Sequence, residues 1–151
     1  MGFIDFLSKL FGNKSQRDLK EITPWVERVK ELYPEIDALS NDELRGRTAA
    51  LRQRIQDYVA SERAEVESLK ASIDGKDLDQ REAIWAQVDK LEKEILDKIE
   101  VILDEIHPEA FAIVKSTGRR FAEQAEIRVQ ATDFDRQLSL THDFVRIEGD
   151  T

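Results

Sequence analysis

Residues 40–106, SNDELRGRTAALRQRIQDYVASERAEVESLKASIDGKDLDQREAIWAQVDKLEKEILDKIEVILDEI, decide the fold. In each half of this stretch, apolar residues recur mostly at steps of three, four or seven, which places their side chains on one face of an α-helix. The first half contributes Leu44, Leu51, Ile55, Val59, Val66, Leu69 and Ile73, and the second contributes Ile84, Val88, Leu91, Ile95, Ile99, Ile102 and Ile106. We therefore expect a long antiparallel helical hairpin, a coiled-coil arm.

Helix start signals stand at the beginning of both halves. Ser40 and Glu43 fit a capping box, in which each side chain accepts a hydrogen bond from the other residue's backbone N–H. The sequence DLDQ at residues 77–80 repeats this arrangement. Between the halves, Gly75 tolerates the left-handed conformation that ends a helix. The chain is predicted to reverse at residues 74–76.

The first twelve residues are rich in bulky apolar side chains that fall on one side of a helix, and basic residues follow them. This pattern is typical of an amphipathic helix that lies on an anionic membrane surface. The residues assigned to membrane docking are Phe3, Ile4, Phe6, Leu7, Lys9, Leu10, Phe11, Lys14 and Arg17. The alternative, that the aromatic residues pack inside the protein or against a second copy, stays open.

Prolines are expected to start or end the helices that flank the arm. A helix at residues 15–32 is expected to restart at Pro24, since threonine before it is a good cap, and to end before Pro34. Pro108 is expected to break the second limb of the arm and to start a helix at residues 108–123.

Near the C-terminus, alternating apolar and polar residues at 127–131 and 144–147 predict two short β-strands. Strands without partners leave backbone groups unpaired, so we interpret the chain as a fragment of a longer protein. The predicted fold is mainly α. Its parts are residues 1–39, an amphipathic segment and helices; residues 40–106, the hairpin arm; and residues 107–151, a helix followed by short strands that start a truncated nucleotide-binding domain.

Charge is distributed unevenly along the chain. The net charge is -9 over 151 residues. Residues 1–20 hold four basic and two acidic residues, whereas residues 61–110 hold seven basic and fifteen acidic ones, a net of -8. Nucleic acid is therefore excluded as a ligand of the arm. No apolar run has the length of a membrane span, and no secretory signal is recognisable, so we expect a cytoplasmic protein.

The sequence contains no pattern for catalysis, nucleotide binding or metal binding. The Gly75-Lys76 pair lacks the earlier glycine and the following serine or threonine of a phosphate-binding loop. His107 has acidic neighbours, but the second histidine lies far along the chain, so we interpret it as a polar residue at a helix junction. Without cysteine, a thiolate zinc site and a disulfide framework are excluded. We assign no catalytic, nucleotide-binding or metal-binding residue to this chain.

Two segments resemble the SecA preprotein translocase motor ATPases. LSNDELRGRT at residues 39–48 is similar to an early motif of that family, and PEAFAIVK at residues 108–115 is similar to its "PEAFA" helix. FLSKLFG at residues 6–12, followed by basic residues, resembles the family's N-terminal amphipathic segment. The chain departs from the commonly described pattern at residues 56–104, which look like an insertion with no role known from the family.

The resemblance implies that the parent protein is an ATP-driven protein exporter that binds ATP and magnesium, and that it works with a protein-conducting channel and a preprotein at the cytoplasmic membrane. It is also compatible with a homodimer. Gln137 superficially resembles the family's glutamine motif, but no glycine-rich loop follows it, so no nucleotide role is carried over. The alternatives are a free-standing helical coiled-coil adaptor and a small enzyme that uses carboxylates of the arm.

Overall fold

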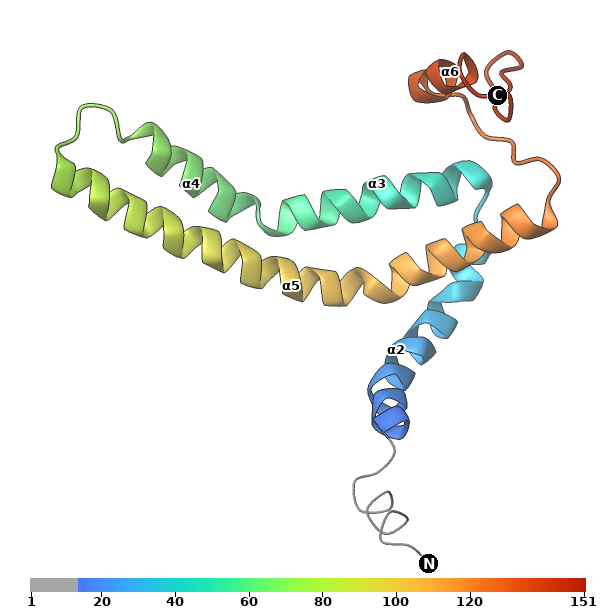
Figure 1. Cartoon of the computed structure of the whole chain (residues 1–151), viewed down its shortest axis with the longest axis horizontal. Helices are drawn as coiled ribbons and strands as arrows, with labels where there is room; N and C mark the ends of the chain where they lie inside the picture. Colours follow the sequence, from blue (N-terminus) through green and yellow to red (C-terminus); the bar gives the residue numbers. More distant parts are fainter. Residues whose placement is uncertain (1–13) are drawn as a thin grey trace, which may run out of the picture. The chain divides into compact units, whose positions relative to one another are not determined.

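The computed structural model describes residues 14–151 and is mainly α-helical, as predicted (Figure 1). The predicted helix at residues 1–12 lies outside the described residues. The helices are α2 (Lys14–Asp37), α3 (Asn41–Tyr58), α4 (Ala60–Ala71), α5 (Leu78–Glu123) and α6 (Asp133–Ser139). The chain forms two compact units: the terminal unit, Met1–Leu44 with Phe111–Thr151, and the arm unit, Arg45–Ala110.

The arm unit is the predicted antiparallel hairpin. Helix α4 lies beside α5, and residues 72–77 join them in the reversal seen in Figure 1. Its core consists of Val59, Val66, Val88 and Ile95, with Leu69, Ile84, Leu91 and Ile99 packed against them. All eight belong to the two predicted stripes. Gly75 has φ 79° in the loop, so the predicted place and cause of the reversal are confirmed.

Ion pairs between the limbs run in antiparallel order. Lys70 Nζ lies 3.0 Å from Glu92 Oε1 near the reversal, and Lys98 Nζ lies 2.6 Å from Glu62 Oε1 farther along. Arg54 Nη2 then lies 2.7 Å from Glu105 Oε1. Along the first limb the residue numbers fall as those of α5 rise, which fixes the register of the hairpin. The pairs formed by Lys70 and Arg54 are about half-exposed and contribute little stability each, so the apolar core carries most of it.

Both predicted helix starts are present, the first with both hydrogen bonds of a capping box and the second with one of the two. The backbone N–H of Ser40 donates to Glu43 Oε2 at 2.8 Å, and the N–H of Glu43 donates to Ser40 Oγ at 3.2 Å, which completes the capping box of α3. At the start of α5, the N–H of Gln80 donates to Asp77 Oδ1 at 2.9 Å. These side chains satisfy donors that have no partner within their own helix.

The first limb of the arm was predicted to be one helix, but it consists of two, α3 and α4. Helix α3 ends at Tyr58 and α4 starts at Ala60, because Val59 between them has φ -116° and ψ 13°, outside the helical region. Val59 is completely buried. The apolar stripe identified Val59 as a core residue, but residue spacing carries no information about the dihedral angles that packing imposes there.

The predicted breaks at the prolines are wrong. Helix α2 passes through Pro24 and Pro34, and α5 passes through Pro108 as a single helix. At Pro24, the preceding threonine does not cap a new helix, because Thr23 Oγ1 donates to the carbonyl of Leu19 one turn earlier. Proline in a helix interior costs about 3 kcal/mol. In α5, continued burial of the helix face before and after Pro108 offsets that cost.

The described residues 14–151 contain no β-strand. The segment predicted as the first strand has no regular secondary structure. One backbone hydrogen bond, from the N–H of Ala131 to the carbonyl of Asp150 at 2.8 Å, connects it to the end of the chain. Between the expected strands lies α6, which Thr132 and Asp135 start with a capping box. Alternation predicts an extended backbone, but a strand also needs a partner with matching register.

Candidate functional site

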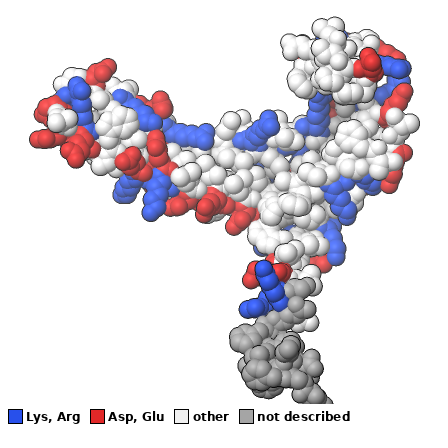
Figure 2. All heavy atoms as spheres, viewed as in Figure 1, with Lys and Arg blue, Asp and Glu red and all other residues white. Residues whose placement is uncertain are grey.

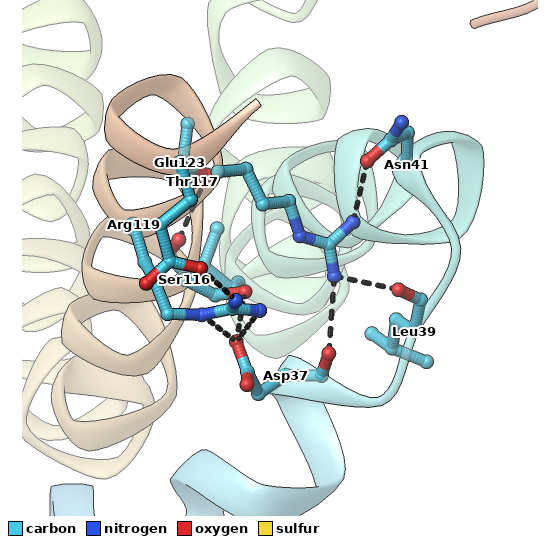
Figure 3. Close-up of polar contacts among 9 residues, drawn as sticks. Asp37, Leu39, Asn41, Ser116, Thr117, Arg119 and Glu123 are labelled. Atoms are coloured by element: carbon cyan, nitrogen blue, oxygen red, sulfur yellow. Dashed lines mark hydrogen bonds and ion pairs between the residues drawn. The ribbon is translucent and has the colours of Figure 1, made fainter. Parts of the chain in front are cut away.

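Arg120 is a buried charged residue of the terminal unit and is only 5% exposed. Its Nη1 donates to Asn41 Oδ1 at 2.7 Å, and its Nη2 donates to the carbonyl oxygens of Leu39 at 2.6 Å and Asp37 at 3.2 Å. We call Arg120 and these three acceptors the Arg120 clamp. Figure 3 shows its acceptors close together, at the end of α2, on the connection that follows, and at the start of α3. The clamp ties this connection to the last part of α5.

The chemistry of arginine suits this position. The carbonyl oxygens at the end of α2 receive no hydrogen bond from an N–H of their own helix, and the negative end of the helix dipole lies there. Helix α2 has no basic residue in its own last turn. Arg120 supplies that positive charge from α5, and its planar guanidinium reaches three acceptors at once, which the ammonium of lysine would do less well.

A second set of contacts surrounds Asp37, beside the clamp. Ser116 Oγ donates to Asp37 Oδ1 at 2.9 Å, and Arg119 donates to the same oxygen through Nε at 3.1 Å and Nη2 at 2.9 Å, as Figure 3 shows. Partial burial acts to raise the pKa of the Asp37 carboxyl, but hydrogen bonds from Arg119, Ser116 and Tyr33 outweigh it and hold that pKa below its ordinary value. Asp37 is therefore ionised at neutral pH.

The C-terminal region is attached to the start of α3. Asn41 Nδ2 donates to the carbonyl of Arg128 at 3.1 Å, and the N–H of Gln130 donates to Asp42 Oδ1 at 2.8 Å. Asn41 thus accepts from Arg120 and donates to the C-terminal region at the same time. An open polar hollow lies here, lined by Asp37, Leu39, Ser40, Asn41, Asp42, Arg119, Arg120, Gln124 and Arg128.

This arrangement holds helices together. The two arginines that are most buried in the hollow already bond to carboxylate, amide or carbonyl oxygens of the chain itself. Within residues 14–151, no group of three or more histidine or carboxylate side chains is placed to hold a metal ion. The hollow is therefore a joint between elements that are far apart in the sequence.

Most of the residues predicted to dock on a membrane lie outside the described residues, namely Phe3, Ile4, Phe6, Leu7, Lys9, Leu10 and Phe11. Lys14 and Arg17 lie in the first turns of α2, and both are exposed. No helix in the described part of the chain is long and apolar enough to span a membrane. The structure does not bring Lys14 and Arg17 to the Arg120 clamp, which is a separate feature.

The Arg120 clamp was not among the features predicted from the sequence. A signal was present, because Ser116 and Arg120 follow Ala112 and Ile113 at helical spacing on the buried face of α5. A polar residue at a core position normally has a hydrogen-bond partner, which the pattern could have indicated. Its partners, two of them backbone carbonyls of a turn some 80 residues earlier, carry no sequence signal at all.

Comparison with known proteins identifies the family. The model of the SecA DEAD-like domain matches residues 7–138. This chain belongs to the SecA family. It is 69% identical over 151 residues to the protein translocase subunit SecA of Porphyromonas gingivalis and 63% identical over 150 residues to that of Parabacteroides distasonis. It is 41% identical over 153 residues to that of Flavobacterium psychrophilum.

These matches cover 99–100% of this chain but only 13–14% of each relative, so the chain spans about one seventh of a SecA protein's length. The matches to the Porphyromonas and Parabacteroides proteins run through the arm unit, so these SecA relatives have a similar sequence there. No solved structure matches the chain. The SecA-like segment at residues 39–48 supplies Leu39 and Asn41 to the Arg120 clamp, which shows what that motif does structurally in this chain.

Proposed function

We propose that this chain is the N-terminal piece of an ATP-driven motor that moves preproteins across the cytoplasmic membrane. The observation that carries the proposal is the family match over residues 7–138, together with relatives that are named protein translocase subunit SecA. ATP and magnesium would be bound by other parts of the whole protein, since this chain is about one seventh of it. The free-standing adaptor is not favoured, because these relatives are much longer proteins.

The role that we propose for this piece is to dock on the membrane surface and to provide scaffold helices. Helix α2 supports it, because Leu19, Ile22 and Val26 lie on one face and are 58%, 54% and 42% exposed. Exposed Lys14 and Arg17 precede them. Each basic residue near an anionic surface contributes about 1 kcal/mol. The apolar face of α2 thus continues the pattern of residues 1–12, and the protein would be peripheral, on the cytoplasmic side.

The partners that this function requires are an anionic membrane surface, a protein-conducting channel and a preprotein. A homodimer is a further proposal on the same basis. The Arg120 clamp supports the scaffold role, because it fixes the connection between α2 and α3 against α5 by three hydrogen bonds of one buried guanidinium. Such a fixed connection is what an anchoring segment needs in order to transmit force to the rest of a motor.

Sedimentation with lipid vesicles tests the docking role. The intact chain is expected to pellet with anionic vesicles at low salt and to be released as salt rises, because counterions screen the basic residues. Phe6→Asp, or removal of residues 1–12, should leave the chain in solution, because each change removes apolar contact with the headgroup boundary.

The matched control is Phe134→Asp, which changes an exposed phenylalanine of α6 in the same way. This variant should pellet like the intact chain. Equal pelleting of the intact chain and Phe6→Asp, or no pelleting of either, would contradict membrane docking by residues 1–12. Neutral vesicles provide the second control, since they should bind less of every variant.

A further inference from the structure

The arm carries a line of apolar side chains that nothing in the arm unit covers. Leu78, Trp85, Leu96 and Leu103 on α5 are 79%, 46%, 63% and 46% exposed. They follow one another at steps of seven, eleven and seven residues. At about 100° per residue, these steps keep all four within roughly 20° of one straight line along the helix, which is about 38 Å long. We call these four residues the apolar line.

The apolar line is separate from the core of the arm. Buried Val88 and Ile95 and their neighbours lie on the face that packs against the first limb. The apolar line lies roughly a quarter of a turn away from that face, where α5 meets solvent. Large exposed apolar residues that are scattered singly need no explanation, but four on one line of a rigid helix form a surface that fits another helix.

A row of acidic side chains borders the apolar line. Six exposed carboxylates follow the same length of α5 on one side of it, namely Asp79, Glu82, Asp89, Asp97, Glu100 and Asp104. Lys90 and Lys93 are the basic residues among them. Within residues 14–151, none of the six carboxylates forms an ion pair or hydrogen bond, whereas Glu92 and Glu105 of α5 are both paired with basic residues of the first limb. Figure 2 shows the acidic side chains gathered along α5.

The negative charge of this surface determines which kind of partner can bind to it. A second copy of the arm would bring two acidic rows together, and an anionic membrane would repel the row in the same way. A helix with an apolar stripe and lysine or arginine beside it satisfies both features at once. Its apolar residues would cover the apolar line while its basic residues meet the unpaired carboxylates.

We propose that the outer face of α5, the apolar line with its acidic row, is a docking surface for a basic amphipathic helix of a partner protein. The arm then has a binding role of its own, in addition to the scaffold and membrane roles of the terminal unit. The steps of seven, eleven and seven suit a straight partner helix laid along α5, because they follow 3.6 residues per turn. Binding is expected to weaken as salt rises, since the acidic row is exposed.

The test uses the full chain with Trp25→Phe, so that Trp85 on the apolar line is the remaining tryptophan. The probe is a synthetic amphipathic helix of leucine and lysine, and the same peptide with glutamate in place of lysine is its control. The basic peptide should shift Trp85 fluorescence to shorter wavelength in a saturable titration, and the acidic peptide should not. Glu100→Lys with Asp104→Lys should weaken binding about tenfold, because two attractive contacts become repulsive.

The matched control is Glu65→Lys with Glu67→Lys, which changes the net charge equally on exposed positions of α4. It should weaken binding less than the α5 pair does, by about twofold, because α4 lies away from the apolar line. Leu96→Ser with Leu103→Ser should also weaken binding while helix content by circular dichroism stays unchanged. Equal weakening by the α4 and α5 pairs, absence of a Trp85 shift, or concentration-dependent dimers that Leu96→Ser with Leu103→Ser abolishes would overturn the proposal.

Discussion

Replacing Arg120 by methionine is expected to lower the free energy of unfolding by about 3 kcal/mol, measured by urea denaturation of the full chain. Methionine keeps much of the volume of the buried side chain but donates no hydrogen bond. The carbonyls of Asp37 and Leu39 and the amide of Asn41 then lose a charged donor. The buried end of α5 loses its three hydrogen bonds, and the partly buried acceptors lose their partner, which is why the expected effect is large.

Arg128→Met is the matched control for this variant. Arg128 has a 68% exposed side chain, and its guanidinium lies 3.5 Å from Glu126 and 3.9 Å from Glu148. Exposed pairs of this kind contribute little, so the control should change stability by about 0.5 kcal/mol or less. Arg120→Lys should fall between the two variants, because it keeps the charge but not the planar fork. Equal stability of Arg120→Met and the unaltered chain would show that the clamp does not hold the terminal unit together.

Replacing Ile95 by alanine is expected to destabilise the arm unit by about 3 kcal/mol. Ile95 is 9% exposed and belongs to the core cluster with Val59, Val66 and Val88. Removing most of its side chain leaves a cavity between two limbs that are held at a fixed spacing by their other core residues. The measurement is the midpoint and slope of urea unfolding, followed by circular dichroism at a helix wavelength.

The neighbouring residue provides the control, because Leu96 is 63% exposed and lies outside the core. Leu96→Ala should change stability by about 0.5 kcal/mol or less, although it removes a side chain of the same size. Equal effects of the two alanines would mean that the limbs do not pack as the apolar stripes require. A larger effect at Leu96 would mean that the face of α5 with Leu96, and not the face with Ile95, packs against the first limb.

The sequence predicted the arm well because periodicity reports directly on burial. Val66, Val88 and Ile95 were placed in the stripes by spacing alone, and all are buried. Gly75 marked the reversal because its positive φ strains residues that have a side chain. In these cases the property that decides the structure belongs to the residue itself or to its near neighbours in sequence.

The predictions failed where distant contacts decide the structure. Pro108 has a strong local tendency to end a helix, yet α5 continues through it because the residues on both sides stay buried. Val59 leaves the helical region in the middle of a regular apolar stripe. The partners of Arg120 could not be predicted from the sequence, because two of its acceptors are backbone carbonyls of a distant turn. Packing and backbone acceptors of this kind are properties of the folded chain.

The most direct test of the central claim is a chimera of the Porphyromonas gingivalis translocase subunit SecA. In it, this chain replaces the matching segment, to which it is 69% identical. The measurement is ATP-dependent movement of a preprotein into inverted membrane vesicles. We expect the chimera to translocate at about the rate of the unaltered protein, and the same chimera with Arg120→Met to lose most of that activity, because its scaffold is no longer fixed. A chimera that is folded and hydrolyses ATP but moves no preprotein would contradict the assignment of this chain to a protein-translocating motor.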